Sequence, residues 1–183
     1  MPQRKTHPRK SQMNLSETSK HREKFLPYLP TTNLLDIGYG GDPVTPWAVC
    51  CDMAGGSYTN VGDAPQQLGF DCRHLPFKDG TLSFCFASHV TEDFFYEEQV
   101  AIYKEWKRCL KSGGMIGLLM PDQKRFEAHC AATGQGLNLA HKEPDMSLAT
   151  FKARVWPQIR GDMAWIVGKD LEDYSFMVVV KKL

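Results

Sequence analysis

The stretch "NLLDIGYGGDPV", residues 33–44, joins a short apolar run to a turn that holds three glycines. A brief apolar run closed by glycine is typical of a strand buried on both faces of a parallel sheet. In open sheets of this kind, the first strand-to-helix turn is a usual place for a nucleotide-like ligand. The stretch therefore predicts a ligand-binding turn near the start of an α/β fold.

The spacing of the glycines narrows the kind of ligand. A dinucleotide turn requires G-x-G-x-x-G, but here Gly38 and Gly40 are followed by Pro43 at the third position. A phosphate loop requires G-K-[ST], and no lysine follows the turn until Lys78. An adenosine cofactor that carries no phosphate remains, and the sequence favours that class.

Further apolar runs extend the sheet, and segments with helical periodicity lie between several of them. We expect strands at residues 33–37, 47–53, 69–77, 81–90, 115–120, 163–168 and 174–182, and helices at 15–29, 97–110, 122–133 and 147–156. The last two strands are joined by "KDLED", which predicts an antiparallel hairpin. The expected fold class is α/β, a Rossmann-like doubly wound, mostly parallel sheet with an antiparallel C-terminal hairpin.

The length of 183 residues suits one domain with a substantial core. Residues 1–30 are interpreted as a basic N-terminal arm and a short helix, because residues 1–24 hold seven Lys and Arg against two Glu. Residues 31–183 are interpreted as a single domain. Within it we expect residues 121–160 to be an insertion on the side of the acceptor, because loops on the ligand face vary while the scaffold stays constant.

Three carboxylates stand at or near the ends of successive expected strands. Asp36 lies beside the glycine turn, where it could orient backbone donors and meet an ammonium group, directly or through water. Asp52 is placed to accept hydrogen bonds from both ribose hydroxyls, and Asp71 to accept one from an adenine amino group. Any one of these acids could instead cap a turn.

Four segments in the right order, "LLDIGYGG", "VCCDM", "DCRHLPFKDGTLSFCFASHVTEDF" and "EWKRCLKSGGMIGLLMPD", resemble the class I S-adenosylmethionine-dependent methyltransferases, in particular a branch of small methyltransferase domains. The similarity covers residues 33–122. It implies S-adenosylmethionine as cofactor and methyl transfer as activity. The site residues it implies are Gly38, Tyr39 and Gly40 for the methionine part, Asp52 for the ribose, Asp71 and the backbone around Cys72 for adenine, and Ser88 and His89 near the sulfonium.

Four positions depart from the pattern of the family. Tyr39 stands where cysteine is frequent, Ser83 replaces an aspartate, Thr91 replaces an aliphatic residue, and Asp93 stands where many members have histidine. Residues 88–93 border the expected active face. A scaffold that has this fold and acts through a partner without catalysis therefore stays open as an alternative.

The acceptor side offers few residues for proton transfer. His89 is the expected general base if the acceptor is a hydroxyl, and Asp122 follows the fifth strand, where it could face the acceptor. Asp122, His129 and His141 match no recognised spacing of metal ligands, so we expect no metal. The expected reaction is an in-line displacement onto a small-molecule or glycan-type acceptor.

Composition limits the partners. The formal net charge is +1, the [ND]-P-P-[FYW] turn of nucleic-acid amino-methylases is replaced by "SHVTED", and residues 1–24 contain no aromatic side chain for stacking on bases. Nucleic acid is therefore unlikely as a partner, and RNA is a weak alternative carried by the basic arm. No apolar run is long enough for a membrane span or a signal, and the six cysteines form no C-x-x-C pair, so we expect a cytoplasmic protein with reduced thiols.

Overall fold

The computed structural model describes residues 16–53 and 65–183, which form a seven-stranded sheet in the order β3-β2-β1-β4-β5-β7-β6. The strands are β1 (Leu34–Ile37), β2 (Val49–Asp52), β3 (Leu68–Gly69), β4 (Leu82–Ser88), β5 (Leu110–Pro121), β6 (Met163–Asp170) and β7 (Ser175–Lys182). Strands β1 to β5 run parallel, β7 is antiparallel to β5, and β6 is antiparallel to β7. The expected fold class, with its antiparallel C-terminal hairpin, is confirmed.

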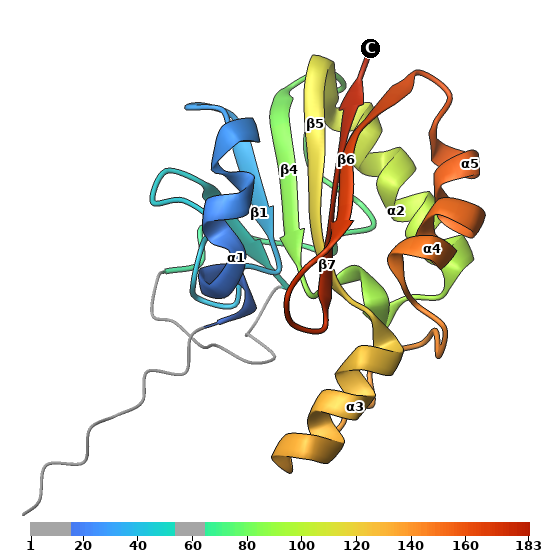
Figure 1. Cartoon of the computed structure of the whole chain (residues 1–183). Helices are drawn as coiled ribbons and strands as arrows, with labels where there is room; N and C mark the ends of the chain where they lie inside the picture. Colours follow the sequence, from blue (N-terminus) through green and yellow to red (C-terminus); the bar gives the residue numbers. More distant parts are fainter. Residues whose placement is uncertain (1–15, 54–64) are drawn as a thin grey trace, which may run out of the picture.

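Helices cover both faces of the sheet (Figure 1). Helix α1 (Glu17–Phe25) lies on one face, and α2 (Tyr96–Cys109), α4 (Leu148–Thr150) and α5 (Trp156–Ile159) lie on the other. The central strand β4 serves both cores because its side chains alternate. Phe84 and Phe86 pack with Phe25 of α1, whereas Cys85 packs in the core under α2.

The connection between β1 and β2, residues 38–48, contains no helix. Its glycines and the prolines Pro43 and Pro46 explain this, because proline removes backbone donors and glycine disfavours helical order. Helix α1 covers this face instead, with Phe25 fully buried and its ring 4.9 Å from that of Phe86. The helix expected at residues 15–29 is thus α1, followed by a 3-10 turn over Leu26–Tyr28.

Two boundaries differ from expectation. The strand expected at residues 69–77 is reduced to β3, which ends at Gly69. After Gly69 the chain turns towards α2, where the indole Nε1 of Trp106 donates to the carbonyl of Cys72 at 2.9 Å. Strand β5 begins directly after α2, at Leu110, so the "KSGG" segment lies in the strand and is not a helix cap. The pairing of β5 with β4 shifts register between Leu82 and Phe84, and this irregularity accommodates the "KSGG" residues in β5.

Residues 121–160 divide into two parts. Helix α3 (Gln123–Thr133) lies beyond the carboxyl ends of β1 and β4 (Figure 1), and Gly134 ends it in the left-handed conformation. The π-helical turn over Phe151–Val155, which joins α4 to α5, packs against α2 together with α5, and Phe151 and Val155 are fully buried. Only the first part of this segment therefore faces the ligand side of the sheet.

No helix within the two described ranges is both long and apolar enough to cross a membrane.

Candidate functional site

A cavity of about 580 Å³ lies at the carboxyl ends of β1, β2 and β4. Its strand side is formed by Gly38, Asp52, Met53, Asp71 and Cys72, which end or follow β1, β2 and β3. Its loop side is formed by His89, Asp93, Asn138, Ala140 and Lys142, which follow β4 and α3. The volume lies within the range of about 300–1,000 Å³ that is usual for small-molecule sites.

At Gly38 the backbone that follows β1 comes close to Val90, which follows β4. Its φ is 67°, a left-handed conformation that favours glycine. A Cβ at this position would lie 2.3 Å from a methyl carbon of Val90, and the Gly38 N–H donates to the carbonyl of Cys51 at 2.8 Å. Only glycine therefore fits between β2 and the chain that follows β4.

Asp36 supports the turn from beneath. Its side chain is buried, does not line the cavity, and accepts a hydrogen bond from the Val44 N–H at 2.6 Å. Burial raises its pKa to about 8, although the bond from Val44 opposes this. Asp36 thus orients a backbone donor, as expected, and is largely protonated at neutral pH.

Asp42 connects the glycine turn to α1. It accepts hydrogen bonds from the hydroxyls of Ser16 and Ser19, and Arg22 pairs with it at 2.5 Å. Burial would raise the pKa of Asp42, but these three donors lower it below its usual value. The turn and the helix that covers the neighbouring face therefore form one unit.

Asp52 and Asp71 both line the strand side, but their carboxylates are engaged differently. Asp52 ends β2, and among the described residues its Oδ1 accepts only from the neighbouring Met53 N–H, at 2.8 Å. Asp71 lies two residues beyond β3 and pairs with Arg73 at 2.6 Å, whose hydrogen bonds lower the Asp71 pKa. The guanidinium of Arg73 stands 5.8 Å from the ring centre of Phe94, which helps to hold the pair at the rim.

Of the other predicted cofactor residues, Tyr39, Gly40 and Ser88 do not line the cavity, whereas Cys72 does. Tyr39 and Ser88 are buried, and burial raises the pKa of Tyr39. Gly40 adopts a φ of 57° in the glycine turn. Cys72 does line the cavity, and burial raises the pKa of its thiol to about 12, so the thiol is neutral and inert.

His89 stands where β4 ends. Its φ of 54° is uncommon for a residue with a side chain, and such strain clusters at functional sites. The His89 N–H donates to the carbonyl of Leu119 at 2.9 Å, and its Nδ1 lies 3.3 Å from Oε1 of Glu92. Burial alone would lower its pKa, but the hydrogen bond and charge of Glu92, reinforced by Glu17 and Asp173, raise it.

Glu92 is the residue near the site that sequence reasoning did not identify as functional. It is 2% exposed and sits in a 3-10 turn over Thr91–Asp93, which brings residues three apart together. A histidine followed three residues later by glutamate at the end of a strand is the signal that could have indicated the contact.

Asp122, His129 and His141 have separate surroundings. Asp122 caps α3 by accepting from the Arg125 N–H at 3.1 Å. His129 packs on Tyr174, with ring centres 4.8 Å apart, and Nδ1 of His141 lies 2.7 Å from Oε1 of Gln123. Asp122 does not line the cavity, so its place next to the acceptor stays a prediction.

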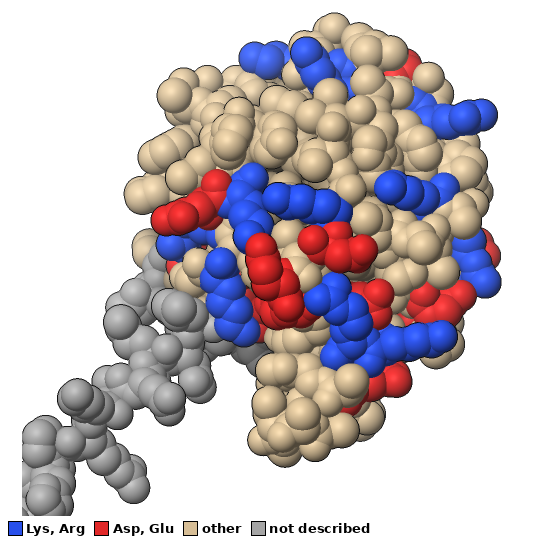
Figure 2. All heavy atoms as spheres, in the orientation of Figure 1, with Lys and Arg blue, Asp and Glu red and all other residues tan. Residues whose placement is uncertain are grey.

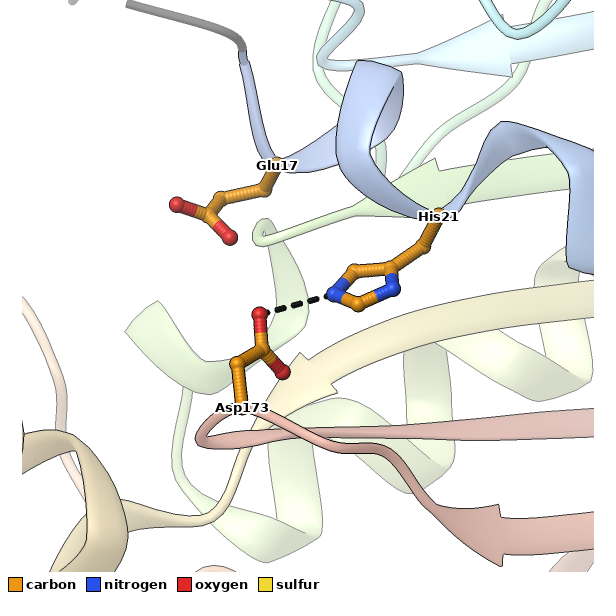
Figure 3. A group of neighbouring side chains, drawn as sticks. All are labelled: Glu17, His21 and Asp173. Atoms are coloured by element: carbon orange, nitrogen blue, oxygen red, sulfur yellow. Dashed lines mark hydrogen bonds and ion pairs between the residues drawn. The ribbon is translucent and has the colours of Figure 1, made fainter.

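A second cluster, Glu17, His21 and Asp173, joins α1 to the turn between β6 and β7 (Figure 3). One possible ligand atom from each residue lies within 4.8 Å of the others. Nε2 of His21 is 2.7 Å from Asp173, and Oε1 of Glu17 already pairs with Lys20 at 2.7 Å and accepts from the Tyr174 hydroxyl at 2.6 Å. These contacts explain the cluster as a fastening of α1, and the Lys20 ammonium opposes a bound cation.

Comparisons with known proteins agree with this architecture. Residues 35–118 match a family model described as a methyltransferase domain. No curated protein matches the sequence.

Among solved structures, the PH0226 protein of Pyrococcus horikoshii OT3 superposes with a TM-score of 0.67 at 16% identity, over 93% of this chain and 94% of that one. A SAM-dependent methyltransferase of Archaeoglobus fulgidus superposes with a TM-score of 0.65 at 13% identity, over 90% and 92% of the two chains. A chain of the complex between the Haloferax volcanii Trm112 methyltransferase activator and a methyltransferase gives 0.63 at 14% identity, over 91% and 88%. These identities indicate a shared fold. The chain thus carries a match to a methyltransferase domain over residues 35–118, within a fold that it shares with SAM-dependent methyltransferases of known structure, and this supports S-adenosylmethionine as its cofactor.

Proposed function

We propose that the protein transfers the methyl group of S-adenosylmethionine to a small-molecule or glycan-type acceptor by in-line displacement. The observation that carries this proposal is that four of the eight residues predicted for the cofactor line one cavity together with His89, namely Gly38, Asp52, Asp71 and Cys72. When bound, the cofactor supplies a methyl group on a positively charged sulfur, which leaves as a neutral thioether. The protein has to align the acceptor and exclude water.

The strand side is the proposed cofactor site. Asp52 is the best placed to receive the ribose hydroxyls, because it ends β2, lines the cavity and, within residues 16–53 and 65–183, has only its neighbour's N–H as partner. Gly38, Tyr39 and Gly40 are assigned to the methionine part, and Asp71 with the backbone of Cys72 to adenine. Asp36 and Ser88 act on the cofactor through the turn and strand that they support, since neither lines the cavity.

The loop side is the proposed acceptor site, with His89 as the group closest to the chemistry. Asp93 and Lys142 also line it, and their opposite charges interact. Asp122 acts indirectly by holding the start of α3, from which the loop with Asn138 and Lys142 continues. These polar groups suit an acceptor that makes several hydrogen bonds, such as a sugar or another polar metabolite.

Surface charge supports a small acceptor over RNA. On the face shown in Figure 2, acidic and basic side chains lie interspersed, with no continuous basic surface. The basic residues of the N-terminal arm before residue 16 lie outside the described residues, so RNA stays the alternative to be tested. Because one similar structure is a complex with the Trm112 activator, the activity should also be tested in the presence of a protein partner. We place the activity in the cytoplasm, where the six free, buried cysteines suit a reducing compartment.

Calorimetry with S-adenosylmethionine, S-adenosylhomocysteine and NAD tests cofactor binding directly. We expect binding of the first two only. Product formation is then measured by mass spectrometry across sugars, nucleotides, small acids and RNA. Methylation of RNA alone would favour the RNA methyltransferase, and a cofactor-binding protein that stays inactive with every acceptor would favour the scaffold.

A further inference from the structure

Glu92 is a buried carboxylate whose charge requires a partner. Its Oε1 lies 3.3 Å from Nδ1 of His89 and 3.9 Å from Nε2 of His141, and its Oε2 has no hydrogen-bond partner among the described residues. An ionised carboxylate is costly to bury unless a cation or several donors compensate it. One of the two histidines therefore has to neutralise Glu92.

The surroundings of His141 make it the weaker candidate for the cation that pairs with Glu92. Nε2 of Gln123 donates to Glu127 at 2.9 Å, which directs Oε1 of Gln123 towards Nδ1 of His141. Nδ1 of His141 therefore carries the proton, and in the neutral ring Nε2 has none to donate to Glu92. Burial lowers the pKa of His141, whereas that of His89 is raised. His89 is thus the histidine that Glu92 pairs with.

The other ring nitrogen of His89 has no protein partner. Nε2 is buried and makes no hydrogen bond within residues 16–53 and 65–183. The neighbouring Tyr174 presents a ring, with centres 6.2 Å apart, and its hydroxyl already donates to Glu17. A buried polar atom without a partner is rare in proteins. Because His89 lines the cavity, a bound molecule could supply the partner that Nε2 lacks among the described residues.

We propose that Glu92 is a positioning residue that holds His89 with Nδ1 protonated, so that Nε2 accepts the proton of a hydroxyl acceptor. This rests on the proposed function. The hydroxyl oxygen forms a bond to the methyl carbon, the carbon–sulfur bond breaks with its electron pair remaining on sulfur, and the hydroxyl proton goes to Nε2. The same arrangement of carboxylate, histidine and hydroxyl activates nucleophiles in unrelated hydrolases.

Glu92 also connects the base to the acceptor loop. Its carbonyl accepts a hydrogen bond from the Lys142 N–H at 2.9 Å, so the loop that lines the cavity is tied to the turn that carries the carboxylate. The charged or titratable groups around His89 are Glu92 and Asp93 in the turn, Glu17 on α1, Asp173 between β6 and β7, and His141 in the loop. Four of these five are acids, and they favour the protonated ring together.

Nuclear magnetic resonance of the full chain with isotope-labelled histidine tests this arrangement without any acceptor. In the wild-type protein, free and with S-adenosylhomocysteine, we expect His89 to titrate above 6.5, with the neutral ring protonated at Nδ1. In Glu92→Gln the pKa of His89 should fall by about 1 or more. Glu97→Gln, which changes an exposed carboxylate at the start of α2, is the control and should leave it unchanged.

The wild-type measurement keeps the inference falsifiable even if Glu92→Gln folds poorly. A wild-type His89 that titrates at or below 6.5, or a neutral ring protonated at Nε2, would overturn it. So would an unchanged pKa in a folded Glu92→Gln protein. Calorimetry of the wild-type protein with S-adenosylhomocysteine separates the two proposals. If the wild type did not bind it, the proposed function would be refuted, whereas the protonation of His89 is measured independently by magnetic resonance of the free protein.

Discussion

The two sides of the cavity are built in different ways. The strand side comes from residues that end or closely follow successive strands, so each of its groups is positioned by a short local motif. The loop side combines the end of β4 with a loop more than forty residues later, and α1 and the β6–β7 turn pack behind it. The strand side is therefore a scaffold for a constant ligand, and the loop side is where burial and long-range contacts set the chemistry.

The largest expected effect tests the loop side. Replacement His89→Gln should lower turnover about 10²–10⁴-fold, the usual contribution of a general base, with cofactor affinity within about threefold. Turnover of the wild type should increase as pH rises through the raised pKa of His89, because only the neutral ring accepts a proton. Stopped assays from pH 5.5 to 9, together with calorimetry, measure both quantities. His74→Gln, at an exposed histidine, is the control, and equal turnover of the two variants would remove His89 from the chemistry.

The next prediction separates Asp36 from the carboxylates that line the cavity. Because the folded-state pKa of Asp36 is raised, the folded protein binds more protons than the unfolded chain between the ordinary value of 3.8 and about 8, and stability falls as pH rises. This loss amounts to about 1.4 kcal/mol per pH unit, or about 2.7 kcal/mol between pH 5 and pH 7. In Asp36→Asn the loss should disappear, while the bond from Val44 is kept.

Urea unfolding at pH 5, 6 and 7 measures that difference in the free energy of unfolding, with Asp170→Asn, at an exposed aspartate, as the control. If Asp36→Asn reproduced the pH dependence of the wild type, Asp36 would be ionised in the folded protein. A direct contact with the ammonium group of the cofactor would then regain support.

Asp52→Ala tests the strand side. Removing a carboxylate that accepts ribose hydroxyls should cost about 1.5–3 kcal/mol, or about 10–150-fold in affinity for S-adenosylhomocysteine. Asp170→Ala, at the far edge strand, should leave the affinity within about twofold. Calorimetry gives the ratio, and similar affinities for the two variants would refute the role of Asp52.

The smallest effect concerns the fastening of α1 behind the loop side. Tyr174→Phe removes the hydroxyl that donates to Glu17 at 2.6 Å, which should lower the free energy of unfolding by about 1–2 kcal/mol. Thermal and urea unfolding measure this loss. Tyr28→Phe is the control, because the Tyr28 hydroxyl makes no hydrogen bond within the described part of the chain. A loss as small as that of the control would show that the bond between Tyr174 and Glu17 does not help to hold α1.

The structure shows what a truncation before β1 would remove from the core. Deletion through Pro30 should weaken cofactor binding. Because Phe25 and Leu34 belong to the same buried cluster as Phe84, this deletion would expose the core. Deletion of residues 1–12, which lie outside the described residues, should still leave affinity within about twofold.

Local patterns were sufficient for much of the fold. Short buried strands such as β1 and β4, and the amphipathic helix α2, follow from hydrophobic periodicity, which depends on neighbours in the chain. The strand expected at residues 69–77 was wrong because Cys72 bonds to Trp106, a contact across 34 positions that no local pattern encodes. The missing helix between β1 and β2 was foreseeable from Pro43 and Pro46, whereas its replacement by α1 was not.

The sequence by itself was sufficient to predict a methyltransferase-like domain and the residues of the cofactor side, because glycines and acids at strand ends act within a few residues of one another. Only the tertiary structure decided that Asp36 is buried, which raises its pKa, and that Asp122 caps a helix. It also decided that Glu92 meets His89 and His141 out of contact with water. The physical reason is that protonation and pairing depend on burial and on charges from distant segments, and both exist only once the chain has packed.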